Sequence, residues 1–396
     1  MLFQVLDNKI ECAAVYLNGE LYYEQTPAGL SKTWGYAPYL GEGVEYASLY
    51  CDGKTLEEVC PDHLKDRHEK ISTRLKSFLI SFSESKIDLT KNCFFDLVPE
   101  RFLKEYCEIK NQITEYVFNN YEKPKNYQFL LELTKVLDKI NKKELNVNLK
   151  QASKHMVTEK GRRFYKKISK TSHNICYDIF STKTGRLTTK KNSFPILTLD
   201  KEFRAALEPN NDLFVELDYN AAELRMLLAL LNQRQPQEDI HDWNAKNVYR
   251  GLVTRDEAKK RIFAWLYNPS SKDFLSSRAY KRDAVVQKYY SDGQVKTFFD
   301  RIIPSDNHHA LNYIIQSSTN DLFLRKMIEL DHYLKDKKSY IAFSIHDSLV
   351  IDFAKEEQNL ISEITRIFSG TNFGDFKANL SIGKNFGEMR KIKWEQ

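Results

Sequence analysis

The sequence predicts an α+β protein in which helical segments interrupt the strands of a shared sheet. Two observations predict this class. Apolar strand patterns at 213–218 and 339–353 lie far apart in the chain, and segments with helical periodicity, including 221–232 and 308–335, lie between them. The length of 396 residues suits two or three domains. A content of 42% hydrophobic and 29% charged residues excludes collagen, coiled coils and wholesale disorder.

The remaining segments follow the same mixture. Residues 1–60 have short strand and turn patterns, and Asn18-Gly19 between VYL and LYY predicts a hairpin. Residues 63–85 and 99–145 have helical periodicity. The stretch TKTGRLTT within 171–200 predicts two strands joined by a turn, whereas 240–300 is expected to be largely helical.

Positive charge is concentrated in one segment. The net charge is only +6, but between Glu122 and Lys170 there are 14 lysines and arginines against 5 acidic residues. Such a segment is expected where one surface faces a polyanion. A solvated lysine-rich helix face has the same pattern, and charge alone does not separate the two readings.

Compartment and covalent chemistry are constrained by what the sequence lacks. It has no C-x-x-C pair, so we expect neither structural zinc nor a disulfide framework and take a reducing compartment, the cytoplasm, as the setting. No apolar run reaches the length of a membrane span, and the first residues do not resemble a secretory signal. We therefore expect no contact with a membrane.

Three acidic residues stand out by their surroundings. Asp218 ends an apolar strand, Glu223 follows in the next helix, and Asp347 lies within the hydrophobic hairpin. A carboxylate in such surroundings is costly to bury unless it is paired or binds a metal. Two aspartates at strand ends could hold two divalent cations for phosphoryl transfer. Taken alone, Asp218 is more typical of a helix cap and Asp347 of a turn residue than of a metal ligand.

Two further patterns have polar side chains at helical spacing. Arg255, Lys259, Phe263 and Tyr267 recur every four residues, so two cations and two aromatic rings follow one helix face and could grip a triphosphate and stack on a base. Asn312-Tyr-Ile-Ile-Gln316 places two amides one turn apart, suited to minor-groove acceptors. The first pattern is also typical of an amphipathic helix with solvated cations. The second is also typical of two amides that cap a helix or lie at the edge of the core.

Taken in order along residues 180–353, these motifs resemble those of family A (DNA polymerase I-like) DNA polymerases of phage type. TGRL resembles the turn whose arginine, here Arg186, touches the primer end. LDYNAAELR resembles motif A. The resemblance implies that Asp218 binds both metal ions, Tyr219 lends its carbonyl, and Glu223 is the steric gate against a ribose 2′-hydroxyl.

The later motifs imply further roles. EDIH implies a triphosphate contact for His241. The helix face that bears Arg255, Lys259, Phe263 and Tyr267, called the stripe below, resembles motif B of the fingers. Arg255 and Lys259 would then hold the triphosphate, with Lys259 as general acid, while Phe263 packs on the nucleotide and Tyr267 stacks near the template base. Asn312 and Gln316 match the palm helix of the family and would sense the minor groove. IHDS resembles motif C, in which His346 would lie near the primer terminus and Asp347 would be the second metal ligand.

Three positions depart from the family pattern. Ser348 stands where motif C usually has glutamate, Asn268 where a glycine usually follows the motif B tyrosine, and His308 where an arginine usually precedes the palm-helix asparagine. The position of Ser348 is the less essential one for metal binding, so we expect activity to survive.

The N-terminal segment resembles a proofreading exonuclease domain that lacks its acids. In place of Tyr-x-x-x-Asp the chain has Tyr106 and Lys110, and in place of Asp-x-Glu it has Asp7 and Lys9. A lysine cannot replace a metal-binding carboxylate. We expect an inactive remnant and no proofreading. An unrelated small α/β domain is the alternative.

The resemblance implies a right-hand polymerase: an antiparallel palm sheet, helical fingers and a short helical thumb beside a small α/β N-terminal domain. The expected domains are the exonuclease-like domain 1–118, thumb 119–170, palm 171–232 and 307–396, and fingers 233–306. The implied cofactor is a pair of Mg²⁺ ions, for which Mn²⁺ can substitute. The implied partners are primer-template DNA and dNTPs, with a monomeric enzyme in a bacterial or phage-infected cytoplasm.

Three rival functions remain open at this stage. A single-subunit RNA polymerase has a similar motif C, but Glu223 is a bulky acid where a ribonucleotide enzyme needs space. A catalytically silent DNA-binding relative has no evident need of Asp218 and Asp347 together. A nuclease would need acidic residues that the N-terminal segment lacks.

Overall fold

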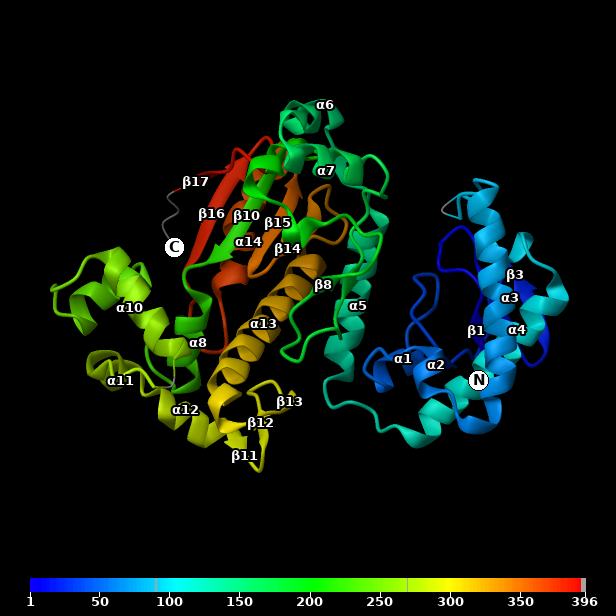
Figure 1. Cartoon of the computed structure of the whole chain (residues 1–396), viewed down its shortest axis with the longest axis horizontal. Coiled ribbons are helices and arrows are strands. Elements are labelled where there is room, and N and C mark those ends of the chain that lie inside the picture. Colours follow the sequence, from blue (N-terminus) through cyan, green and yellow to red (C-terminus); the bar gives the residue numbers. More distant parts are fainter. Residues whose placement is uncertain (90, 269, 393–396) are drawn as a thin grey trace. The chain divides into compact units, whose positions relative to one another are not determined.

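The computed structural model describes residues 1–89, 91–268 and 270–392 (Figure 1). The chain forms two compact units, Met1–Lys135 and Val136–Gln396. Helix α5 (Tyr127–Lys142) runs from the first unit into the second. The mixture of helices and antiparallel sheets confirms the predicted α+β class. Within the described ranges, no helix is both long and apolar enough to cross a bilayer.

The first unit is built on a small sheet and two long helices. The sheet has the order β1 (Gln4–Val5), β2 (Ala14–Leu17) and β3 (Glu20–Tyr23). Asn18 and Gly19 have φ angles of +51° and +88°, which a type I′ hairpin turn requires, so this predicted hairpin is confirmed. Helices α3 (Lys65–Glu84) and α4 (Glu100–Asn120) pack against each other. The short elements are β4 (Lys32–Thr33), β5 (Glu45–Tyr46), α1 (Ala47–Tyr50) and α2 (Leu56–Val59).

One cysteine pair departs from expectation. Cys12 and Cys93 form a disulfide across 81 residues of chain. The sequence analysis expected no disulfide framework and did not foresee this single bridge, because the fold brings together two cysteines whose spacing carries no signal. Cys51, Cys60 and Cys107 are buried free thiols, and Cys176 is free and half-buried.

The second unit is organised by a five-stranded antiparallel sheet (Figure 1). Its order is β14 (Tyr340–Ile345), β15 (Ser348–Phe353), β10 (Leu213–Tyr219), β16 (Ala378–Gly383) and β17 (Arg390–Ile392). The predicted strand at 213–218 and the predicted hairpin at 339–353 are both confirmed. In the observed register, Asp218 lies directly opposite Ser348 on one side and Asn379 on the other.

Helices cover one face of this sheet. The predicted helices at 308–335 and 221–232 are confirmed as α13 (Asn307–Tyr333) and α8 (Ala222–Leu230), and α13 packs against α8 and α14 (Ile361–Ser369). Tyr219 stacks on Phe368 of α14 at 4.3 Å between ring centroids. Successive strand residues point to opposite faces, so the Asp218 side chain lies on the other face.

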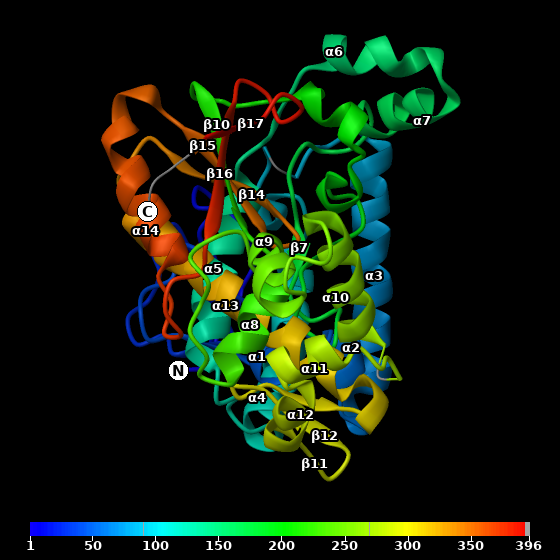
Figure 2. The ribbon, with the colours of Figure 1, turned by 90° about the vertical axis from the view of Figure 1, so that its left-hand side faces the viewer.

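A helical segment joins α8 to α13. Figure 2 views it from the side of α10. It contains α9 (Ile240–Trp243), a π-helical turn (Asn244–Val248), α10 (Arg255–Tyr267), α11 (Phe274–Tyr280) and α12 (Arg282–Tyr289). The expectation that 240–300 is largely helical is confirmed as far as Tyr289, and a small sheet that was not foreseen forms after it. Asp292 and Gly293 have positive φ angles and turn the chain between β11 (Tyr290–Ser291) and β12 (Gln294–Lys296), which pairs with β13 (Ile302–Pro304).

The remaining elements precede β10. Helices α6 (Leu149–Ser153) and α7 (Glu159–Ile168) pack together, and the predicted strands around TKTGRLTT are confirmed as the pair β7 (Tyr177–Asp178) and β8 (Thr188–Thr189). Strand β6 (Asn146–Val147) pairs with β9 (Leu207–Glu208).

We expect Phe343→Ala to lower the free energy of unfolding of the second unit by about 3–5 kcal/mol. Phe343 is fully buried and its ring meets those of Phe214 and Phe386 at 5.7 and 5.2 Å, so truncation leaves a cavity in the sheet core. Chemical denaturation measures the change. Phe274→Ala is the control, because that ring is 74% exposed, and a similar loss in both variants would contradict the assignment of the core.

Candidate active site

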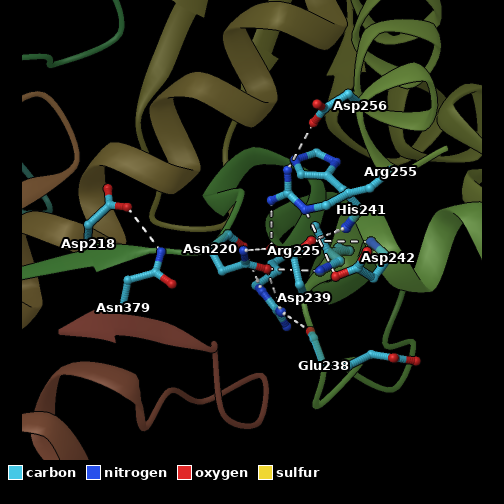
Figure 3. A network of polar contacts seen from close by, with 11 residues as sticks. Asp218, Asn220, Arg225, Glu238, Asp239, His241, Asp242, Arg255, Asp256 and Asn379 are labelled. Carbon is cyan, nitrogen blue, oxygen red and sulfur yellow. Dashed lines mark hydrogen bonds and ion pairs between the residues drawn. The ribbon is translucent and has the colours of Figure 1, made fainter. Parts of the chain in front are cut away.

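The two predicted metal-binding aspartates meet at one end of the central sheet. Asp218 ends the pairing of β10 with β15, and Asp347 lies in the turn that immediately precedes its partner residue Ser348. Burial and, to a smaller extent, the negative charge of nearby Asp347 together raise the pKa of Asp218 to about 6. Asn379 partly offsets this by donating a hydrogen bond to Asp218 at 3.3 Å (Figure 3).

A cavity of about 450 Å³ adjoins this pair. It is lined by Arg186, Glu223, Gln316, His346 and Asp347, so five of the predicted site residues come together from four segments of the chain. Arg186 pairs with Glu223 at 3.0 Å. Burial raises the pKa of Glu223, Arg186 opposes that shift, and Asp347 adds to it. His346, at the turn, has a φ of +54°.

The predicted stripe on α10 forms a second group. Phe263 and Tyr267 are stacked at 6.0 Å between centroids, and the ring of His241 lies 5.8 Å from that of Phe263. Burial lowers the pKa of His241, Asp239 counters it, and the cations Arg255 and Lys259 lower it further. All five predicted residues of this segment therefore lie around one helix face.

Polar contacts join the end of β10 to this group (Figure 3). Asn220 donates to Asp239 at 2.8 Å, and Asp239 in turn accepts from Arg255 at 2.8 Å. Burial alone would raise the pKa of Asp239, but the hydrogen bonds from Arg255, Asn220 and backbone amides hold it well below its usual range. Asn220, at the end of β10, is thus linked through Asp239 to Arg255 on α10.

Arg225 supports the same junction from inside. Its side chain is fully buried, and it donates to the carbonyl oxygens of Asn220, Pro236 and Glu238 at 2.8, 2.7 and 3.0 Å. The sequence analysis missed Asn220, Arg225 and Asp239. The available signal was an arginine within the apolar run of α8, which a surface role does not explain.

The oxygen ligands at the strand ends fit a hard divalent cation. Asp218 is half-buried and Asp347 is exposed, and burial together with the negative charge of Asp347 raises the pKa of Asp218. The Tyr219 side chain is buried and donates to Phe368, so only its backbone carbonyl remains as a further ligand. Among the described residues, no three His, Cys, Asp or Glu side chains cluster as a metal site on their own.

Comparison with known proteins finds relatives that match about half of this chain. The chain is 23% identical to DNA polymerase I of Borreliella burgdorferi over 266 residues, and 26% identical to DNA polymerase I of Caldicellulosiruptor bescii over 238 residues. These matches cover 52% and 47% of the chain but only 29% and 28% of the relatives. No protein-family model matches the sequence.

A solved structure, the POL domain of Pol1 from M. smegmatis in complex with DNA primer-template and dNTP, shares the fold. Its TM-score is 0.62 at 14% identity, and the alignment covers 87% of this chain and 82% of that one. The resemblance to family A DNA polymerases is confirmed. The right-hand polymerase fold predicted from the motifs is confirmed with it.

The first departure from the family A pattern has a structural counterpart. Ser348 donates a hydrogen bond to Glu216 at 2.7 Å. Glu216 lies two residues before Asp218 and so on the same face of β10, and its charge also raises the pKa of Asp218. Ser348 therefore holds a carboxylate, that of Glu216, on the same strand and face as Asp218. Glu216 could have been found from the sequence, because it lies two residues before Asp218 in the strand LFVELDY and alternate strand residues share a face.

The other two departures lie at helix ends. Asn268 follows the last residue of α10, and its side-chain oxygen accepts from the amide of Ser270. His308 is exposed in the first turn of α13. Asn312 lies one turn before Gln316 on α13, half-buried, and outside the cavity lining that the described residues form. The structure thus brings Gln316, but not Asn312, to the cavity.

We expect Asp218→Asn to stabilise the metal-free protein in a pH-dependent way. Because the folded-state pKa lies above the unfolded-state value, charged Asp218 destabilises the fold above about pH 6, and this cost disappears below about pH 4. The variant should gain about 2–3 kcal/mol in unfolding free energy at pH 7.5 and almost nothing at pH 4. Denaturation in EDTA at both pH values measures it.

The same substitution at Asp283, whose side chain is 90% exposed, serves as the control. It should change stability by less than about 0.5 kcal/mol at either pH. A gain at Asp218 that is equal at both pH values, or a loss at pH 7.5, would contradict the electrostatic account.

Proposed function

We propose that this chain is a template-directed DNA polymerase that adds dNTPs to the 3′-hydroxyl of a primer without proofreading. The observation that carries the proposal is the meeting of Asp218 and Asp347 at the edge of a cavity that Arg186, Glu223 and Gln316 also line. This is the set of residues that phosphoryl transfer to a sugar hydroxyl needs: metal ligands, a cation and polar groups that position the primer.

Asp218 and Asp347, with the backbone carbonyl of Tyr219, would hold two Mg²⁺ ions, and Mn²⁺ could replace them. The ions would favour the deprotonated 3′-hydroxyl and stabilise the charge of the leaving pyrophosphate. The contribution of the protein is to hold two like charges side by side, which costs stability without cations and therefore favours their binding.

The triphosphate would lie along α10. Arg255, Lys259 and His241 would bind its oxygens, and Lys259 is our candidate for the acid that protonates the leaving pyrophosphate. His241 is held largely neutral by burial, so it would act as a hydrogen-bond donor. Phe263 and Tyr267, already stacked on each other, offer a surface for the incoming base and the template base.

The primer end would lie in the cavity. Arg186 and Gln316 line it, and Asn312 one turn away extends the same helix face toward the minor groove. His346 would contact the primer terminus. Glu223, half-enclosed by its pair with Arg186, would block a ribose 2′-hydroxyl. The fingers helix α10 would test base-pair shape before chemistry.

The N-terminal segments would support this reaction without catalysing another. We propose residues 1–118 as an inactive exonuclease-like domain, 119–170 as a thumb, 233–306 as fingers, and 171–232 with 307–396 as palm. Both oxygens of Asp7 are taken up by Lys9 at 2.7 and 2.8 Å, which leaves them poorly suited to a metal. The exposed cations of the thumb would follow the DNA backbone: Lys150, Lys154, Lys160, Arg162, Arg163, Lys166, Lys167 and Lys170.

The proposed setting is DNA replication in a bacterial or phage-infected cytoplasm, by a monomer. The reaction can be tested without knowledge of that setting. A primed oligonucleotide template, Mg²⁺ and the four dNTPs contain every component that the site would use.

We expect Asp347→Asn to reduce primer extension by at least about 10³-fold while leaving DNA binding nearly unchanged. The amide keeps the shape of the side chain but removes the charge that the cations need. Single-turnover extension on gels and fluorescence anisotropy with labelled DNA measure the two properties. Asp336→Asn, at an exposed position, is the control. Full activity of Asp347→Asn would refute the assignment of this residue.

We expect Glu223→Ala to raise the use of rNTPs relative to dNTPs by about 10- to 100-fold. The shorter side chain opens the space that a 2′-hydroxyl would occupy. Ratios of kcat/KM for the two sugars in wild type and variant measure the change. An unchanged ratio would remove Glu223 as the gate, and a wild-type preference for rNTPs would replace DNA polymerase by RNA polymerase as the function.

A further inference from the structure

We propose that Arg301 is a positioning residue, which fixes the turn that bears Arg186 and so sets how Arg186 meets the primer terminus. Arg301 lies outside every motif that the sequence analysis singled out. The inference rests on the proposed polymerase function for the role of Arg186, but the contact between Arg301 and the turn is a property of the fold alone.

Arg301 is itself rigidly held. Its Nε and Nη2 donate to the two carboxylate oxygens of Asp321 at 3.1 and 2.6 Å, in the two-pronged geometry that fixes the guanidinium plane. Asp321 is only 2% exposed and lies in the middle of α13. The backbone of Arg301 is anchored as well, because its amide and carbonyl both bond to Thr297.

The turn touches this guanidinium at Gly185. A Cβ atom on Gly185 would lie 2.5 Å from Nη2 and 2.6 Å from Cζ of Arg301, distances that real side chains do not adopt. Gly185 also has a φ of +77°, which favours glycine. Its carbonyl accepts a hydrogen bond from Asn320 at 2.8 Å. Two adjacent residues of α13 therefore hold the same peptide, Asn320 directly and Asp321 through Arg301.

Arg186 is the next residue in the chain. Its carbonyl accepts from the hydroxyl of Thr182 at 2.8 Å, which closes the turn, and its guanidinium reaches Glu223 at 3.0 Å. A shift of Gly185 therefore moves the Arg186 backbone relative to the cavity. A misplacement of about 1 Å can cost a reaction up to about 100-fold, so the position of the turn matters for chemistry as well as for stability.

A double-mutant cycle between Arg301→Lys and Arg186→Ala tests the proposal. Lysine keeps the charge beside Asp321 but loses the planar fork that fills the space under Gly185. We expect Arg301→Lys alone to lower the single-turnover extension rate about tenfold and to weaken anisotropy-measured binding of primer-template DNA with a recessed 3′ end. In the Arg186→Ala background, Arg301→Lys should add almost nothing to either property.

Arg366→Lys is the matched control, because Arg366 forms the same two-pronged contact with Glu363, but on the exposed surface of α14. It should leave rate and binding unchanged. Thermal melting of each variant detects loss of folding. Should Arg301→Lys fail to fold, Gly185→Ala perturbs the same contact from the turn side, and its effect should also vanish in the Arg186→Ala background.

The outcomes are distinct. An Arg301→Lys effect that persists in full without Arg186, or an Arg301→Lys variant equal to wild type, would overturn the positioning role while leaving the polymerase function intact. If the wild type does not extend primers at all, the proposed function fails. The binding cycle then still decides whether Arg301 acts through Arg186.

Discussion

The whole site depends on the register between β10 and β15. Their antiparallel pairing places Asp218 opposite Ser348, and so beside Asp347 in the adjoining turn. A slip of one residue would turn Asp218 to the face that α14 covers, where Tyr219 now packs on Phe368. The burial of that face thus fixes the register, and the register brings two like charges together. The stability of the apolar sheet offsets the electrostatic cost of the pair.

A second constraint links this strand end to the helical segment after α8. Arg225 has no room to move, since it is buried and donates to three backbone carbonyls around Asn220 and the 236–238 loop. These carbonyls would otherwise lack partners in the interior, and a buried guanidinium without them would be costly. Arg225 and the carbonyls therefore satisfy one another. The consequence is that Asp239, and through it Arg255, keeps a fixed place relative to Asp218.

The sequence predicted most of the frame because its signals were local. The strand at 213–218, the hairpin at 339–353 and the long helix α13 follow from periodicity, and Asn18-Gly19 from turn chemistry. What it could not show are contacts between residues distant in sequence. The Cys12–Cys93 bridge, the bond between Ser348 and Glu216, and the packing of Arg301 on Gly185 carry no spacing signal, because tertiary packing alone creates them. The Asp292-Gly293 hairpin was different: its signal was present and was overridden by helical periodicity.

Two cations of the site, Arg186 and Arg255, form ion pairs with carboxylates of the same chain. Arg186 pairs with Glu223 and Arg255 with Asp239, each at 3.0 Å or less. Such pairs are partly exposed, so each contributes little to stability and can be exchanged at low cost. A triphosphate or a primer phosphate brings more negative charge than one carboxylate, so it can compete for these cations. The pairs would therefore hold the two guanidinium groups near the positions that the proposed binding of DNA and nucleotide requires.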